Sequence, residues 1–208
     1  DVEKWYYIPV GGDVSAGGKV DRVDECDGLV RVIDYKTGNI SYTAEEYYAG
    51  VKLQLPLYLL AASKGKRPAG AYYFPANVEF GDKPAGDFTL KGFMDCGEEV
   101  VRNTDKTIKD KERSAFVDAY LNGRQLAGGL PEEDFSDFIA YSALIAKRGA
   151  KEMFGGNIAP SPFTGACDYC KMGGMCGFAA GPDSRPRSID GITCADVARI
   201  VKKLRGEE

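Results

Sequence analysis

Two stretches of alternating residues, separated by Asp27-Gly28, constrain the fold of this 208-residue chain more than any other feature. The first spans residues 18–24 and the second spans residues 32–38. Asp-Gly is typical of a two-residue β-hairpin turn, because both residues tolerate the positive φ that such a turn requires. The sequence therefore predicts a hairpin, and pairing outward from the turn determines which side chains are neighbours.

The predicted register places Asp21 directly opposite Asp34. Lys36 shares the face of Asp34, whereas Val20 and Ile33 are predicted to face the other side of the sheet. Two carboxylates across a strand pair repel each other, and Mg²⁺ or Mn²⁺ prefers such oxygen ligands together with water and phosphate. The pattern predicts a metal site for phosphodiester hydrolysis, in which Lys36 orients water and stabilises the phosphoryl charge.

The alternative interpretation is an ordinary hairpin whose charged residues face water, because Asp-x-Lys is a common tripeptide. A three-residue loop would also shift the pairing and separate Asp21 from Asp34. Further motifs are needed to choose between a metal site and a solvated surface.

Three motifs follow one another along the chain. G-K-V-D-R-V-D (18–24) precedes V-I-D-Y-K-T-G (32–38), and a Q-x-x-x-Y element follows at Gln54 and Tyr58. This order resembles the RecB-type branch of the PD-(D/E)XK nucleases. The resemblance implies metal ligands at Asp21, Asp34 and the Tyr35 backbone carbonyl, catalytic roles for Asp21, Asp34 and Lys36, and DNA binding by Gln54 and Tyr58.

The resemblance also implies an α/β fold with a restriction-endonuclease-like core, in which helices flank a mixed central sheet. A helical and cysteine-loop extension would follow at the C-terminus. We expect the nuclease core at residues 1–96, a helical segment of the same domain at 97–160, and the cysteine loop with a last helix at 161–208.

Local signals predict the individual elements. A capping box at Thr43 and Glu46 predicts a helix that runs to Ser63 and bends at Pro56. The remaining expectations are strands at 5–10, 71–75 and 88–94, a connection at 81–86, and helices at 98–121, 134–154 and 193–204.

Cys167, Cys170 and Cys176 form C-x2-C-x5-C in a Gly-rich loop. In a cytosolic chain this spacing favours a metal over disulfides, and both zinc and an iron–sulfur cluster fit it. The motif resembles the one that closes the nuclease domain of AddB-type helicase–nuclease subunits, which implies a [4Fe-4S] cluster in the full-length protein. That family has a fourth cysteine and a metal-binding histidine upstream. We therefore expect this chain to be truncated, its cluster incomplete or absent, and its own nuclease activity low.

The net charge of −4 argues at first sight against nucleic acid, but Lys19, Arg22, Arg31 and Lys36 cluster near the predicted site. The partners implied by the resemblance are double-strand DNA ends, an unwound single strand and a helicase–nuclease partner subunit. No apolar run is long enough to cross a membrane, and the polar start has no signal-peptide character. We expect a cytoplasmic protein.

Other interpretations stay open. A CRISPR-associated RecB-like exonuclease has similar motifs and cysteines, although the insertion between Met94 and Pro160 favours the AddB type. A catalytically inert, nuclease-like module would only guide DNA or hold subunits together. The presence of Asp21, Asp34 and Lys36 favours an active nuclease. A third possibility is a cysteine-bound metal module whose hairpin charges are incidental.

Overall fold

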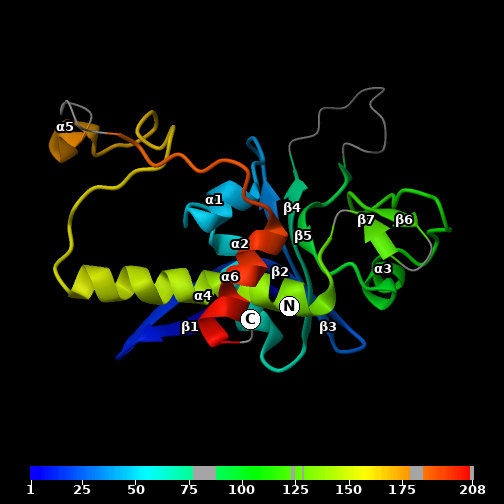
Figure 1. Cartoon of the computed structure of the whole chain (residues 1–208). Coiled ribbons are helices and arrows are strands. Elements are labelled where there is room, and N and C mark those ends of the chain that lie inside the picture. Colours follow the sequence, from blue (N-terminus) through cyan, green and yellow to red (C-terminus); the bar gives the residue numbers. More distant parts are fainter. Residues whose placement is uncertain (77–87, 123–124, 128, 179–184, 207–208) are drawn as a thin grey trace.

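A five-stranded mixed sheet with the order β1-β2-β3-β4-β5 forms the centre of the molecule (Figure 1). The computed structural model describes residues 1–76, 88–122, 125–127, 129–178 and 185–206. The strands are β1 (Val2–Gly11), β2 (Val14–Cys26), β3 (Leu29–Lys36), β4 (Arg67–Pro75) and β5 (Lys91–Met94). Only β3 and β4 are parallel among these neighbours; the other pairs are antiparallel.

Helices flank this sheet, which confirms the predicted α/β arrangement and agrees with a restriction-endonuclease-like core. The helices are α1 (Ala44–Tyr48), α2 (Gln54–Ser63), α3 (Glu98–Thr104), α4 (Glu132–Phe154), α5 (Gly173–Cys176) and α6 (Cys194–Arg205). A small second sheet pairs β6 (Tyr120–Asn122) with β7 (Gln125–Ala127). In Figure 1, the segment that carries α5 extends away from the sheet.

The central strand β3 is buried on both faces. Val30 and Val32 pack into a first core with residues of α2, α4 and α6. Ile33 points the other way, into a second core with Val101 of α3 and Leu121 of β6. Such burial on both sides explains why β3 is apolar from Leu29 to Ile33, except for Arg31, which pairs with Asp24. The polar residues at that end are therefore held by a rigid, fully packed strand.

The predicted hairpin is confirmed. Asp27 and Gly28 both have positive φ, 51° and 78°, as a two-residue primed turn requires. Asp24 pairs with Arg31 across the two strands, and their side chains form an ion pair at 3.1 Å. The turn thus determines the β2–β3 register, as the sequence predicted.

The predicted face of Val20 is wrong. Val20 packs in the first core with Val32, and alternation along β3 places Asp34 on that same side. Buried positions in β2 are two residues apart up to Val20, but the next is Val23, so the alternation slips by one residue. This slip falls at Asp21 and lies outside what strict period-two alternation can predict.

The single helix predicted from Thr43 to Ser63 is also wrong. The capping box of Thr43 and Glu46 is present, but α1 ends at Tyr48 and Gly50 turns the chain with a φ of 81°. A second helix, α2, then begins at Gln54. Pro56 lies in its first turn, where a backbone N–H has no helical partner in any case, so no bend is needed.

The helix predicted at 98–121 is wrong beyond Thr104. The buried Asp105 carboxylate accepts hydrogen bonds from the Thr107 backbone N–H and from the Ser114 hydroxyl, at 3.0 and 2.9 Å. These bonds hold an irregular loop in place of further helical turns. Helices α4 and α6 confirm two other predictions. The strand predicted at 88–94 forms over 91–94, and the predicted connection at 81–86 lies outside the described residues.

No helix in the part of the chain that the structure describes is long and apolar enough to cross a bilayer.

Replacing Gly28 with alanine tests the turn. Open space surrounds the position, so the cost of Gly28→Ala is that of a left-handed backbone with a Cβ, about 1 kcal/mol of unfolding free energy. Gly38 also has open space but no positive φ, so Gly38→Ala is the matched control and should be neutral or slightly stabilising. Urea denaturation of both variants measures the difference. Equal stabilities would contradict the assigned turn.

Candidate active site

Five side chains that the sequence singled out meet at one end of β3. Asp34 and Lys36 lie at the end of this strand, and Asp21 comes from the adjacent β2. Gln54 and Tyr58 lie one turn apart at the start of α2, which packs against β3. Because their spacing is i to i+4, both reach the same side of the helix. The fold therefore brings two strands and one helix to a common polar cluster.

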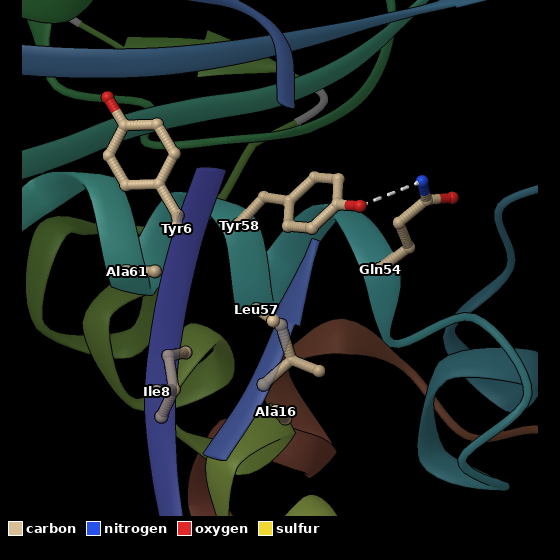
Figure 2. Close-up of a pocket in the computed structure, with 8 residues that line it drawn as sticks. Tyr6, Ile8, Ala16, Gln54, Leu57, Tyr58 and Ala61 are labelled. Atoms are coloured by element: carbon tan, nitrogen blue, oxygen red, sulfur yellow. Dashed lines mark hydrogen bonds between the residues drawn. The ribbon is translucent and has the colours of Figure 1, made fainter. Parts of the chain in front are cut away.

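Asp34 is the centre of this cluster. Only 4% of the residue is exposed, yet both of its carboxylate oxygens contact polar groups. Gln54 Nε2 donates to Oδ1 at 3.2 Å, and the Lys36 ammonium forms an ion pair with Oδ2. Gln54 Nε2 also lies 3.4 Å from the Tyr58 hydroxyl, as the dashed line in Figure 2 marks. One amide thus connects the buried carboxylate to the DNA-binding candidate Tyr58.

The Asp21 side chain contacts the end of β3 through a hydrogen bond with the backbone of that strand. Its Oδ2 accepts a hydrogen bond of 2.9 Å from the N–H of Tyr35. The pairing of β2 with β3 ends one step earlier, at Arg22 and Ile33, so Asp21 lies directly beyond the last paired residue. The Tyr35 ring lies edge-on to Phe74 at 5.6 Å, away from the polar cluster. Tyr35 therefore takes part in the cluster through its main chain.

Burial raises the pKa of Asp34 above its ordinary value of 3.8. The Lys36 ammonium opposes this rise, and the negative charge of Asp21 adds to it. The two carboxylates are therefore close enough to repel each other. A cation bound between them would relieve this repulsion and favour the ionised form of both.

Tyr73 belongs to the same cluster, and the sequence did not single it out as a site residue. It lies beside Asp34 in the parallel β3–β4 register, and Lys36 Nζ lies 5.5 Å from the centre of its ring. Burial, with smaller contributions from the charges of Asp34 and Glu46, raises the pKa of Tyr73 to about 12. The phenol stays protonated at neutral pH and can stabilise the lysine by a cation–π contact.

The basic residues predicted near the site are already paired. Lys19 contacts Glu3 at 2.7 Å, and Arg22 and Arg31 share the carboxylate of Asp24 at 2.8 and 3.1 Å. Two of these three positive charges are therefore balanced locally, by Glu3 and Asp24. Arg22 pairs across the strands with Ile33, and both arginines line a hollow together with Ile33, on the face of the sheet opposite Asp34. The predicted cluster of Lys and Arg therefore does not form around the site.

The oxygen ligands of the site fit a hard divalent cation. Asp21 and Asp34 supply carboxylates, and the chain has no histidine. Across the described ranges, no group of three or more His, Cys, Asp or Glu residues is arranged to hold a metal ion. Mg²⁺ is often bound by one or two carboxylates and completed by water and phosphate. A two-carboxylate site of this kind is thus consistent with Mg²⁺ or Mn²⁺, with water or phosphate as further ligands.

The cysteine loop does not form a metal centre in this structure. Cys167, Cys170 and Cys176 are all exposed, in the segment that extends away from the sheet. The described residues offer no arrangement of cysteines that fits an iron–sulfur cluster. The polar cluster at the end of β3 is therefore built without these cysteines.

Comparison with known proteins identifies the family. Residues 2–177 match the PD-(D/E)XK nuclease superfamily. This chain belongs to that superfamily.

Individual known proteins also resemble the chain over most of its length. The B subunit of an ATP-dependent helicase/deoxyribonuclease from Caldanaerobacter subterraneus subsp. tengcongensis is 31% identical over 81% of this chain and 17% of the relative. The protein of the same name from Alkaliphilus metalliredigens is 27% identical over 93% of this chain and 20% of the relative. The chain therefore spans about a fifth of the length of these relatives.

The pKa of Asp34 predicts a stability difference in this nuclease domain. A raised folded-state pKa contributes stability that is fully present below the unfolded value and is lost as the pH rises through the folded pKa. Asp34→Asn cannot ionise, so its free energy of unfolding should exceed that of the wild type at pH 7. The gain should shrink to a minimum below about pH 4.

Asp196→Asn is a control of opposite sign. The hydroxyl and backbone of Thr193 hold the pKa of Asp196 below its ordinary value, so this substitution should lower stability at pH 7. Urea denaturation between pH 3 and 8 measures both variants. A loss of stability in Asp34→Asn at pH 7 would contradict the claim that burial destabilises the ionised Asp34 carboxylate.

Proposed function

We propose that this chain is the metal-dependent nuclease module of a longer helicase–nuclease subunit, which processes double-strand DNA ends during recombinational repair. The observation that carries this proposal is the buried Asp34 carboxylate, with Lys36 and Asp21 at the same strand end. The names of the relatives support the assignment to a helicase/deoxyribonuclease. Within this proposal, the module is an exonuclease that cuts one of the unwound strands.

Each residue of the cluster would have its own role in phosphodiester hydrolysis. Asp21, Asp34 and the Tyr35 carbonyl would hold Mg²⁺ or Mn²⁺, which supplies positive charge to the phosphoryl oxygens and lowers the pKa of water when bound. The Lys36 ammonium now contacts Asp34 and would turn toward the attacking water and the phosphate. Gln54 and Tyr58 would hold the DNA backbone beside the buried carboxylate.

Other parts of the longer protein and a partner subunit would complete the helicase–nuclease. We propose a helicase partner subunit, which presents an unwound single strand, and a cytoplasmic location. A [4Fe-4S] cluster would use Cys167, Cys170 and Cys176 with a cysteine from outside this chain. Within the chain, residues 1–96 would form the nuclease core, 97–160 a helical segment and 161–208 the cysteine loop with the last helix.

Cleavage of linear DNA by the complete helicase–nuclease tests the proposal. In the presence of Mg²⁺, Asp34→Ala or Lys36→Ala should lower the cleavage rate by about 10²–10³-fold, since each removes charge placed at the reacting phosphate. Lys66→Ala is the matched control and should leave the rate unchanged. Lys66 forms its ion pair with Glu25, next to the residues where β3 begins rather than ends.

Two outcomes would contradict the proposal. Cleavage that survives Asp34→Ala would place the chemistry elsewhere. DNA binding without any metal-dependent cleavage by the wild type would favour an inert module that only guides DNA.

A further inference from the structure

An apolar pocket opens beside the polar cluster, between the β1–β2 ribbon and α2 (Figure 2). Its volume is about 230 Å³. Tyr6, Ile8 and Ala16 line it from the ribbon, and Gln54, Leu57 and Tyr58 line it from the helix. Figure 2 shows Tyr6 and Ile8 along one strand, and Tyr58 reaching from the helix toward Gln54. The pocket is thus mostly apolar, with an amide and a hydroxyl at one side.

Gln54 belongs both to this pocket and to the candidate active site. Its Nε2 lies 3.2 Å from Asp34 Oδ1 and 3.4 Å from the Tyr58 hydroxyl. The pocket therefore begins one side chain away from the carboxylate proposed to act at the phosphate. In a nucleic acid, the group attached next to each phosphate is a sugar that carries a base. A phosphate at Asp34 would bring such a base to this pocket.

Glycine in β2 lets the Tyr58 side chain lie against the ribbon. A Cβ on Gly18 would come within 2.2 Å of the Tyr58 hydroxyl, far closer than atoms can approach. The neighbouring Gly17 likewise lets the Tyr7 ring lie against the opposite face of the ribbon, because a Cβ there would meet that ring at 2.3 Å. Gly18 thus allows the Tyr58 ring to form an aromatic wall of the pocket. The small side chain of Ala16 leaves the interior of the pocket open.

A single nucleobase has the chemistry that this pocket can take. Bases stack on aromatic side chains with little dependence on sequence, because every base has a flat apolar face. The volume is below the usual range for drug-sized ligands, which suits one ring system. Gln54 and Tyr58 offer few hydrogen-bonding groups, so the pocket would hold any base.

We propose that this pocket receives the base of the nucleotide next to the scissile phosphate. A base in a duplex is paired and stacked, and only an unpaired base can leave the stack at low cost. The pocket would therefore make the site selective for single-stranded DNA without making it selective for sequence. This inference depends on the proposed nuclease function and adds a positioning subsite to it.

Cleavage of single-stranded oligonucleotides with one abasic position tests the pocket. With the complete helicase–nuclease and Mg²⁺, the wild type should cut the phosphate beside the abasic position about tenfold more slowly than the others, because one stacking contact is lost there. Ala16→Leu fills the pocket. It should slow cutting at phosphates beside intact bases by about tenfold, and leave the rate at the abasic position unchanged.

The unchanged rate at the abasic position shows that Ala16→Leu is folded and active, and Ala16→Val should have an intermediate effect. Trp5→Ala is the matched aromatic control. Trp5 is 57% exposed, stacks on Tyr7 at 6.0 Å and does not line the pocket. This variant should cut like the wild type.

Equal cleavage of abasic and intact positions by the wild type would overturn the pocket and leave the proposed nuclease intact. If Ala16→Leu still cuts more slowly beside the abasic position than beside intact bases, base binding lies elsewhere. The same holds if Trp5→Ala loses this difference in rate. Absence of any cleavage that depends on Asp34 would overturn the proposed function itself, and the pocket proposal with it.

Discussion

The burial of one carboxylate, Asp34, is the constraint on which the site depends. A buried charge is costly unless charged or hydrogen-bonding groups surround it. Here Lys36 follows on the same strand face, and Gln54 reaches across from α2. The position of α2 against β3 is therefore tied to the same carboxylate that would bind the metal. The unfavourable pairing with Asp21 persists because the strands hold both residues in place, and a cation bound between the two carboxylates would relieve it.

The packing of β3 explains why the charged residues are held so firmly. Val32 and Ile33 fill the two cores on opposite faces, and the polar residues Asp34 and Lys36 follow directly at the end of the strand. The slip in the alternation of β2 then allows Val20 to join the first core while Asp21 reaches the backbone of the neighbouring strand. Core packing and the polar cluster are thus built from consecutive residues of the same two strands.

Local chemistry predicted the turn at Gly28 and the helix cap at Thr43, because each depends on residues within a few positions. The break at Gly50 follows from a glycine at positive φ, a local signal that the prediction of one long helix did not use. The loop around buried Asp105 was not predictable, since its hydrogen bonds join residues up to ten positions apart. Spacing and resemblance predicted the polar cluster at the end of β3, which consists of Asp21, Asp34, Lys36, Gln54 and Tyr58. Tyr73 and the apolar pocket were not predicted, because they depend on how β3 pairs with β4 and how α2 lies on the ribbon.

Binding of Mn²⁺ to this chain without DNA, followed by electron paramagnetic resonance, tests whether Asp21 and Asp34 share a cation. Two nearby carboxylates predict one bound ion that Asp21→Asn and Asp34→Asn each abolish, because each removes half of the charged ligands. Cys167→Ser should leave this binding unchanged, since the cysteine loop lies apart from the sheet. Mn²⁺ binding that survives both aspartate substitutions, or that requires Cys167, would contradict a metal site at the end of β3.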